Sequence, residues 1–275
     1  MAKAFYIGVG GVARKVKQPY IGVNSVARKA KKGYIGINGV ARQFLSGGIP
    51  ISSLAVGSTL YLNENGSSIP YLVVHQGKPS SIYDDSCNGT WLLRTDIIKD
   101  DVWSSDNENG IAYSSVFSWL NSTMLSKYDS NIQNTIKQVK IPYMTYGTGS
   151  LKTGANGYSC KVFLLSGYEV GGYYDASKYI YLPQDGAKLD YFISGNNETT
   201  ANNRRKAWAT GETHGHYNHP WWLRSPSTDN TYYQFSLGGD GQIDSGNATN
   251  LFGLRPAIIM PSDTLINTST NTIIT

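Results

Sequence analysis

The stretch 221–257 constrains the fold of this chain most, because its two ends are apolar and its middle is polar. It reads WWLRSPSTDNTYYQFSLGGDGQIDSGNATNLFGLRPA. The apolar runs 221–223 and 254–260 are each typical of a buried strand. Residues 232–237 alternate well enough for a half-buried strand, and the segments 238–241 and 244–247 are predicted turns. We therefore expect a small sheet with a rigid interior and solvent-exposed turns.

Arg224 and Arg255 each lie beside one of these apolar runs, just before Ser-Pro or Pro. An arginine in such surroundings is desolvated, so we expect both guanidinium groups to bond carbonyl or carboxylate oxygens. Their predicted role is structural. The same pattern predicts that Trp221 and Trp222 are buried together with Arg255.

The motif WWLRSP at 221–226, followed by GLRPA at 253–257, resembles the end of a C-type-lectin-like domain. This variety of the domain is shared by formylglycine-generating-enzyme-like proteins and many phage and bacterial surface proteins. Segments 71–79, 87–93, 136–143 and 161–170 resemble, in that order, a domain of tail-fibre-like proteins from phages and prophages of low-GC Gram-positive bacteria. The resemblance covers residues 50–263 and implies an α+β, C-type-lectin-like ligand-binding domain over 55–275.

Residues 1–46 contain a repeat with a period of 14 residues: YIGVGGVAR at 6–14, YIGVNSVAR at 20–28 and YIGINGVAR at 34–42. Each copy predicts two short strands joined by a two-residue turn. One copy cannot bury its own apolar face, so copies must stack on each other or across chains. We therefore expect a small all-β attachment or oligomerisation module, most simply in a homotrimer. Such repeats resemble the N-terminal segments of phage tail proteins, which implies contacts with tail or baseplate proteins.

Positive charge is concentrated in this first part of the chain. Residues 1–44 hold nine Lys and Arg and no acidic residue, so they carry +9; the whole chain is +5, which leaves 5 − 9 = −4 for residues 45–275. Basic residues spaced at strand edges protect those edges from pairing, and we expect no nucleic-acid partner. No apolar run approaches ~18 residues, so we expect no membrane insertion.

Between the module and the domain, residues 47–54 are a predicted linker containing Gly-Gly and Pro. A hairpin is predicted within 60–74 and strands at 91–94 and 162–165. Helices are predicted to begin near Ser114 or Ser115, and over 130–138 behind an Asp129 N-cap with Val139 on the apolar face. The long polar stretch 171–215 is typical of functional loops. Cys87 and Cys160 are expected to be free, buried thiols.

Two kinds of chemistry compete with simple binding. His214, His216 and His219 have a spacing that could hold Zn²⁺, although no flanking element fixes their geometry. Lectin-like domains often hold a structural Ca²⁺ on oxygen ligands, for which Asp229, Asp240 and Asp244 are candidates. No spacing in the sequence fixes a metal site, so we expect no cofactor, and a structural Ca²⁺ is the alternative left open.

Enzyme activity is the other alternative. Formylglycine-generating oxidases work through a pair of cysteines close to the C-terminus. In this chain no cysteine follows Leu254, and the two that exist are Cys87 and Cys160. No Ser-His-Asp order, P-loop or HExxH motif is visible either. We therefore expect no catalysis.

The favoured hypothesis is a phage or prophage receptor-binding protein of the virion tail, which recognises a host-cell-surface protein or glycan. Tyrosine supplies rigid contact area, and Asn, Ser and Asp supply adaptable hydrogen bonds, as in antibody loops. The candidate ligand-binding residues are Thr228, Asp229, Asn230, Tyr232, Tyr233, Gln234, Asp240, Gln242, Asp244, Ser245, Asn247, Thr249 and Asn250. We expect Tyr232, Gln242 and Asn247 to be exposed on one face.

The same resemblance leaves a bacterial surface adhesin as an alternative identity. Lectin-like domains that end this way resemble the variable proteins of diversity-generating retroelements, so the polar middle of 221–257 is a candidate hypervariable region in either case. The first residues, MAKAFYIGVGG, lack the apolar core of a signal peptide. That favours a phage protein made in the bacterial cytoplasm and acting outside the cell.

Overall fold

The computed structural model describes residues 48–172, 181–192, 198–212 and 218–274, together with the backbone of six strands within residues 6–46. Those six strands pair as three antiparallel hairpins, and each hairpin is one copy of the repeat. They are β1 (Tyr6–Val9) with β2 (Val12–Lys15), β3 (Tyr20–Val23) with β4 (Val26–Lys29), and β5 (Lys32–Ile37) with β6 (Val40–Ser46). The predicted strand–turn–strand copies are therefore confirmed, and their stacking into a trimer stays a prediction.

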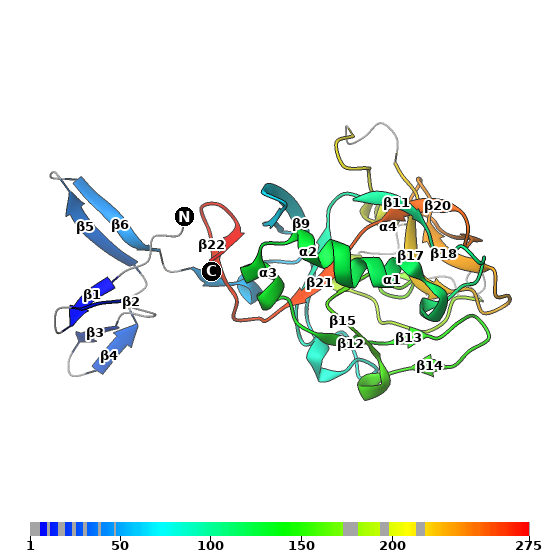
Figure 1. Ribbon diagram of the computed structural model, residues 1–275, viewed down its shortest axis with the longest axis horizontal. Helices are drawn as coiled ribbons and strands as arrows, with labels where there is room; N and C mark the ends of the chain where they lie inside the picture. Colours follow the sequence, from blue (N-terminus) through cyan, green and yellow to red (C-terminus); the bar gives the residue numbers. More distant parts are fainter. Residues whose placement is uncertain are drawn as a thin grey trace.

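Two larger sheets build the rest of the described chain (Figure 1). The first has the order β16–β21–β10–β9–β8–β23–β22–β7, and the second has the order β11–β20–β17–β18–β19. The first sheet consists of β7 (Ile49–Pro50), β8 (Thr59–Glu64), β9 (Ser67–Gly77), β10 (Gly89–Arg94), β16 (Val162–Phe163), β21 (Ala257–Met260), β22 (Leu265–Asn267) and β23 (Thr272–Ile273). The second consists of β11 (Lys99–Val102), β17 (Trp221–Pro226), β18 (Tyr233–Leu237), β19 (Ile243–Asn247) and β20 (Leu251–Leu254). Two small hairpins flank them, β12 (Val139–Ile141) with β15 (Tyr158–Cys160) and β13 (Tyr143–Met144) with β14 (Leu151–Lys152).

The helices are short and lie against these sheets. α1 (Ser115–Trp119), a π-helical segment η4 (Leu120–Met124) and α2 (Leu125–Lys127) follow one another as one continuous helix (Figure 1), and α3 (Ser130–Thr135) and α4 (Glu198–Arg205) are separate. Single 3₁₀ turns are η1 (Ile51–Ser53), η2 (Asp85–Cys87), η3 (Ile111–Tyr113), η5 (Gly154–Asn156) and η7 (Asp190–Phe192). Helices and many strands in one unit make the fold α+β, as expected. In the part of the chain that the structure describes, no helix is long and apolar enough to cross a membrane.

Large aromatic side chains fill the core. Trp91, Trp103, Trp221 and Trp222 are all completely buried. Trp91 meets the Phe163 ring edge-on at 5.5 Å between centroids, and Trp103 meets Trp222 edge-on at 6.2 Å. Edge-to-face pairs of this kind add about 0.5–1.5 kcal/mol beyond the area they bury. Since Trp103 and Trp222 come from segments far apart in sequence, the contact between them holds β17 of the second sheet to the loop that follows β11.

The apolar run 254–260 was predicted as one strand, and the structure corrects this: it is divided between the two sheets. β20 ends at Leu254 and β21 begins at Ala257. Proline has no N–H to give to a strand ladder, so Pro256 ends the pairing. Arg255 Nε donates to the Arg94 carbonyl at 2.9 Å, and Arg94 N donates to the Pro256 carbonyl at 2.9 Å. The chain therefore crosses from one sheet to the other at a bonded Arg-Pro step.

Two other predictions about local structure are also wrong. Residues 244–247 form most of strand β19 and not a turn, because they pair with β18 in the register Phe235↔Ser245; tertiary pairing overrides the low strand propensity of Asp, Ser, Gly and Asn. The helix predicted over 130–138 ends at Thr135, since Ile136 adopts an extended ψ of 126°. Val139 then begins β12 instead of lying on the helix.

The predicted linker 47–54 is also partly structured. Ile49 and Pro50 form strand β7, which pairs with Ile266 and Leu265 of β22. Ile51 is completely buried in the core. The chain therefore enters the domain through the first sheet, beside β22.

Candidate functional site

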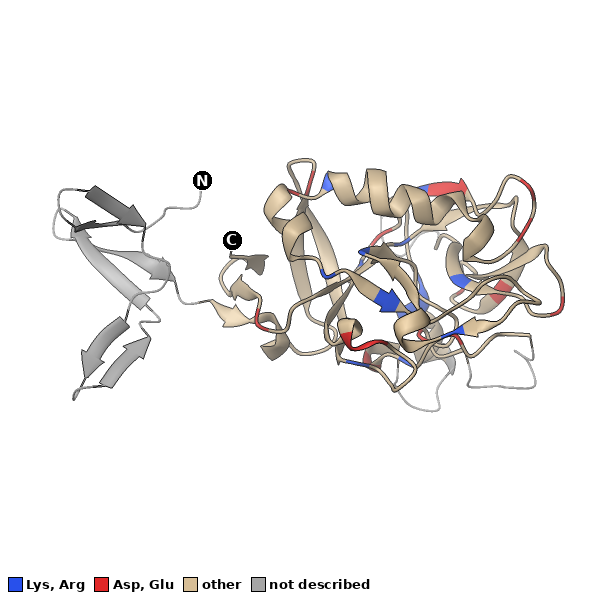
Figure 2. Ribbon diagram, turned by 60° about the horizontal axis from the view of Figure 1, so that its bottom comes forward, with Lys and Arg blue, Asp and Glu red and all other residues tan. Residues whose placement is uncertain are grey.

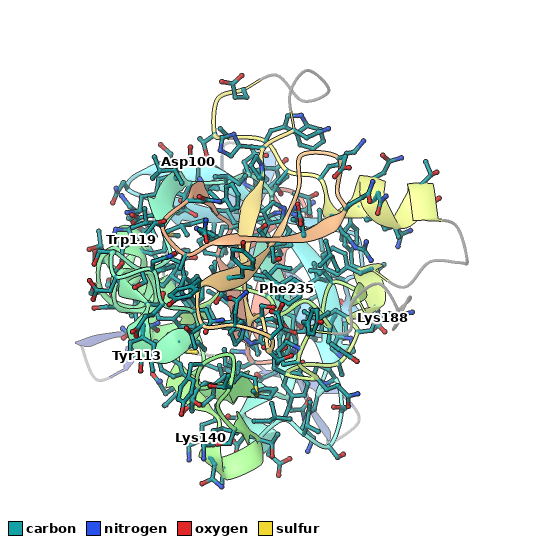
Figure 3. All side chains as sticks on the ribbon, turned by 90° about the vertical axis from the view of Figure 1, so that its right-hand side faces the viewer. Asp100, Tyr113, Trp119, Lys140, Lys188 and Phe235 are labelled. Atoms are coloured by element: carbon teal, nitrogen blue, oxygen red, sulfur yellow. The ribbon has the colours of Figure 1, made fainter. Side chains whose placement is uncertain are left out.

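The candidate site lies at the end of the domain opposite β22 (Figure 1), where the β18–β19 hairpin forms one edge of the second sheet. Figure 3 looks onto this end, with Phe235 of β18 near the middle of the view. We call the surface formed by residues 227–250 the β18–β19 face. It contains all of the residues predicted to bind a ligand.

The two strands of the hairpin place alternate side chains on one side. Tyr233 pairs with Asn247, Phe235 with Ser245, and Leu237 with Ile243. Because side chains alternate along a strand, these six lie on the same side of the hairpin. Tyr233 and Asn247 are exposed, whereas Phe235 and Ile243 are each only 6% exposed. The outer pair is therefore open to solvent and the inner pairs form an apolar floor.

A hollow of about 510 Å³ lies over this floor. Six of the predicted residues line it: Asp229, Tyr233, Asp240, Gln242, Asp244 and Ser245. Its other lining residues were not among the named ligand-binding candidates, although Tyr181 belongs to the stretch 171–215 predicted to be functional; they are Tyr181, Ser227, Phe235, Gly238 and Ile243. Tyr181 comes from the long polar stretch before β17 and is 48% exposed. The hollow therefore combines three carboxylates with two exposed phenol rings.

The remaining predicted residues, apart from Gln234, are either exposed or half-buried. Tyr232, Asn247, Thr249 and Asn250 are exposed beyond the hollow, and Tyr232 is 55% exposed. Thr228 and Asn230 are half-buried and shape the loop: the Thr228 hydroxyl donates to the Tyr181 carbonyl, and Asn230 Oδ1 accepts from the amides of Tyr232 and Tyr233. The predicted exposure of Tyr232, Gln242 and Asn247 is confirmed. So is the predicted burial of Trp221, Trp222 and Arg255.

The prediction that Gln234 binds a ligand is wrong, because its side chain is completely buried. Gln234 Nε2 donates to the Leu223 carbonyl at 2.7 Å, and its Oε1 accepts from the Gly110 amide at 3.0 Å. It lies on the opposite side of β18 from Tyr233, since the two are adjacent in the strand. Gln234 therefore braces the hairpin from within and does not reach a ligand.

Asn109 also holds the hairpin in place, and no pattern in the sequence pointed to it. It is completely buried beneath the loop before β18. Its Nδ2 donates to the carbonyls of Ser227, Asn230 and Tyr233 at 2.8–3.0 Å, and its Oδ1 accepts from Gly147 N at 2.8 Å. A Cβ at position 147 would lie 2.1 Å from the Ser227 carbonyl oxygen, so only glycine fits there. One buried amide thus fixes the loop 227–233 against two other segments.

A smaller hollow of about 240 Å³ lies beside Asn109. It is lined by Glu108, Tyr113, Tyr146 and Thr231 as well as Asn109. Tyr113 and Tyr146 are 49% and 38% exposed, and their rings meet edge-on at 6.3 Å. Because Thr231 belongs to the β18–β19 face, this exposed tyrosine pair extends the face onto segments 103–114 and 143–151.

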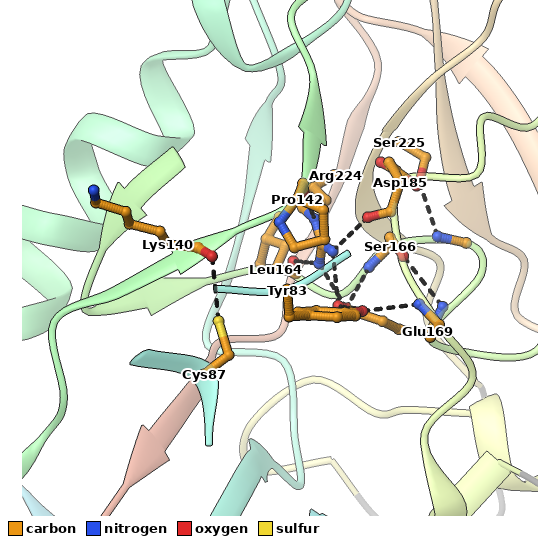
Figure 4. Close-up of polar contacts among 12 residues, drawn as sticks. Tyr83, Cys87, Lys140, Pro142, Leu164, Ser166, Glu169, Asp185, Arg224 and Ser225 are labelled. Carbon is orange, nitrogen blue, oxygen red and sulfur yellow. Dashed lines mark hydrogen bonds and ion pairs between the residues drawn. The ribbon is translucent and has the colours of Figure 1, made fainter. Parts of the chain in front are cut away.

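Behind the site, Arg224 of β17 is completely buried in a polar network (Figure 4). Its Nη1 and Nη2 form a bidentate pair with Glu169 at 2.5 and 2.7 Å. The guanidinium also donates to three carbonyl oxygens, those of Pro142, Leu164 and Asp185. The prediction that Arg224 bonds carbonyls and a carboxylate is confirmed. Arg255 likewise donates to the Arg94 carbonyl and lies 5.1 Å from the Trp221 ring centroid.

Burial shifts the pKa values of several charged groups in and near this network. It raises the pKa of Asp185 to about 7, against the opposing effects of Arg224 and of the Ser225 hydroxyl. The Ser225 hydroxyl donates to both Asp185 carboxylate oxygens, at 2.8 and 3.0 Å. Burial lowers the pKa of Arg255 to about 10. For Arg224 burial also opposes the charge, but the ion pair with Glu169 outweighs it and raises the pKa of the guanidinium.

The cysteines and histidines offer no assembled reactive centre among the described residues. Cys87 and Cys160 are free and buried, as predicted. Burial raises the pKa of the Cys87 thiol to about 11 and also raises that of Cys160, and a raised pKa disfavours the thiolate that acts as nucleophile. His219 Nε2 lies 2.8 Å from Asp100 Oδ1. His214 and His216 lie outside the described residues.

The calcium candidates can be tested against the same geometry. Within 48–172, 181–192, 198–212 and 218–274, no three His, Cys, Asp or Glu side chains converge in a way that could hold a metal ion. Asp229, Asp240 and Asp244 line one hollow but do not form such a group. The alternative of a structural Ca²⁺ therefore has no assembled ligand set among the described residues.

Comparison with known proteins gives a family but no activity. The chain belongs to the DUF6273 family, a domain of unknown function, whose family model matches residues 88–262. That range includes β17 and the whole β18–β19 face. No curated protein and no solved structure matches the chain.

The role of Asn109 gives the first prediction. In Asn109→Asp, a carboxylate would face three carbonyl oxygens in place of an NH₂ donor. We expect this buried, unpaired charge to lower the free energy of unfolding by about 3–5 kcal/mol at pH 7. Asn156→Asp, at an exposed position, is the matched control and should change it by less than about 0.5 kcal/mol. Urea denaturation measures both, and equal midpoints would contradict the role of Asn109.

The raised pKa of Asp185 gives the second. Its folded pKa, about 7, lies above the ordinary value of 3.8, so the folded state holds a proton that the unfolded chain releases. The resulting stability is complete below about pH 4 and is lost as the pH rises through 7, at roughly 1 kcal/mol per pH unit. Asp185→Asn removes this pH dependence. The free energy of unfolding of the variant should therefore rise relative to that of the native protein between pH 5 and pH 8. Denaturation at both pH values measures the difference; a constant difference would refute the assignment.

Proposed function

We propose that this member of the DUF6273 family is a binding protein that performs no reaction: a phage or prophage tail receptor-binding protein. In this proposal the domain formed by residues 55–275 is C-type-lectin-like. Its β18–β19 face recognises a protein or glycan on the host-cell surface. The observation that carries the proposal is that buried residues hold the backbone of this face while many of its side chains are exposed. Exposed Tyr, Asn, Gln and Asp side chains stand on a hairpin whose backbone is held by buried residues.

This separation supports binding because recognition surfaces need rigid anchors and adaptable polar contacts. Tyr232 and Tyr233 are 55% and 41% exposed, and between them they could bury a large area against a partner. Their backbone is fixed by Asn109 and Asn230 beneath and beside them. A partner therefore meets a preorganised surface, which reduces the entropy cost of association.

The position of the site in the domain also supports a tail protein. The chain enters the domain through β7, which pairs with β22, and the β18–β19 face lies at the far end (Figure 1). An attachment module that precedes β7 would leave that face free to meet a target. This is the arrangement that a receptor-binding tip requires.

Diversification by a retroelement is part of the same proposal. Substitutions at Tyr232, Gln242, Asn247 or Thr249 would not disturb the core, because surface changes usually alter stability by no more than about 0.5 kcal/mol. A near-copy of the DNA that encodes 227–250, next to a reverse-transcriptase gene, would support it. A gene neighbourhood of surface-anchored proteins without tail genes would support the adhesin instead.

The binding role predicts a specific outcome of mutation. The triple variant Tyr232→Ala, Tyr233→Ala, Gln242→Ala should melt within a few degrees of the native protein, because all three side chains are exposed. Its attachment to host cells should fall at least about tenfold, since tyrosines at the centre of an interface commonly contribute more than 1 kcal/mol each. Flow cytometry with labelled protein measures attachment.

Tyr61→Ala is the matched control, because Tyr61 is 38% exposed on β8 in the other sheet. It should attach normally. Normal attachment of the triple variant would place the binding surface elsewhere, and unfolding of the triple variant would show that these residues belong to the framework.

The repeat module predicts an oligomer. We expect the full chain to be a trimer, because one 14-residue copy has too little apolar area to fold alone. A chain of residues 47–275, which keeps β7, should be a monomer. Light scattering at several concentrations gives both masses. Monomers in both cases would rule out oligomerisation through residues 1–46.

A further inference from the structure

The charged residues of the β18–β19 face and of the two segments beside it are all acidic. Segments 103–114, 143–151 and 227–250 contain no Lys, Arg or His. Their acidic residues are Asp106, Glu108, Asp229, Asp240 and Asp244, which gives −5 for these segments, against +5 for the whole chain. Figure 2 shows acidic residues in the loops at the end of the domain opposite β22. This end therefore carries a local field that attracts cations.

The hollow of about 510 Å³ concentrates this charge. Asp229, Asp240 and Asp244 line it, and none of its described lining residues is basic. The Ser227 hydroxyl donates to Asp229 Oδ1 at 2.5 Å, the Gln242 amide to Asp240 Oδ1 at 2.9 Å, and the Ser245 amide to Asp244 Oδ1 at 2.7 Å. These bonds orient the carboxylates without neutralising them. No ion pair with a described residue offsets their charge.

Aromatic and apolar groups complete the lining. The exposed Tyr181 and Tyr233 rings border the hollow, and Phe235 and Ile243 form its floor. A cation over an aromatic face gains about 0.5–2 kcal/mol, and arginine makes this contact most often. An apolar floor suits the alkyl stem of Arg or Lys, whose charged head then reaches the carboxylates at the rim.

We propose that the hollow receives an arginine or lysine side chain from a protein on the host surface, an inference that rests on the proposed function. A protein partner fits better than an amino sugar because the exposed aromatics extend well beyond the hollow. Tyr232 is exposed on the β18–β19 face, and Tyr113 and Tyr146 line the smaller hollow that shares Thr231 with this face. A central pocket for one basic anchor, surrounded by flatter tyrosine contacts, is the usual arrangement of a protein–protein hot spot.

The test removes the charge and keeps the shape. In the variant Asp229→Asn, Asp240→Asn, Asp244→Asn, each side chain keeps an Oδ1 that can accept the same hydrogen bond, so the loops should hold their conformation. The matched control is Asp85→Asn, Asp129→Asn, Asp263→Asn, which changes the net charge equally at exposed positions outside the three segments. The full chain is used throughout, and thermal melting checks folding. If the triple variant does not fold, Asp240→Asn and Asp244→Asn are tested singly.

Calorimetry at low salt compares three probes: acetyl-tetraarginine amide, the uncharged acetyl-tetracitrulline amide, and a glucosamine tetramer. We expect the native protein to bind the arginine peptide at least about tenfold more tightly than the citrulline peptide. The hollow variant should lose that preference, and the control should keep it within about twofold. Equal loss in both variants would show non-specific attraction and overturn the proposal, as would binding of the glucosamine tetramer in preference to the arginine peptide.

Host-cell attachment separates this inference from the proposed function. The hollow variant should attach at least about tenfold more weakly, with a weaker salt dependence than the native protein. If it attaches normally while the Tyr232, Tyr233 and Gln242 variant does not, the basic-anchor inference is wrong and the proposed function stands. If both attach normally, both are wrong.

Discussion

The ion pair between Arg224 and Glu169 is the interaction on which the rest of the second sheet depends. It is completely buried and bidentate, and Arg224 also binds carbonyl oxygens from three other segments. Removing one partner of such a pair typically costs about 3–5 kcal/mol, because the other charge is left buried and alone. Tyr83 donates to Glu169 and Ser225 donates to Asp185, which satisfies the remaining oxygens. β17 is thereby fixed in the sheet, and β18 pairs directly with it.

Between β17 and the start of β18, side chains change from completely buried to exposed within a few residues. Trp222 and Arg224 point into the core, whereas Tyr232 and Tyr233 are open to solvent. The loop between β17 and β18 is held at both ends, because Asn109 bonds the Ser227 and Tyr233 carbonyls and Gln234 bonds the Leu223 carbonyl. Buried amides satisfy carbonyl groups that would otherwise be desolvated without partners. A surface built in this way can vary its side chains while its backbone stays in place.

Charge follows the same division of the chain. The first 44 residues carry +9, and the rest carries −4. The three segments at the candidate site hold five acidic residues and no basic ones. Such a separation affects the rate and orientation of encounter more than the final affinity, since exposed charges are screened within about 8 Å at physiological salt. In the proposed function, long-range attraction of a basic target would precede its short-range contact with the exposed tyrosines.

The sequence by itself determined the buried tryptophans, the bonded arginines, the hairpin repeats and the exposure of Tyr232, because each depends on local polarity and spacing. Only the tertiary structure decided that Arg255 and Pro256 carry the chain between two sheets, and that 244–247 is a strand, since strand pairing outweighs local propensity. Asn109 could not be assigned to the site in advance, and Tyr181 was expected only as one residue of the functional loops in 171–215. They lie far from the 221–257 stretch in the chain, and their roles come from contacts that exist only once distant segments are packed together.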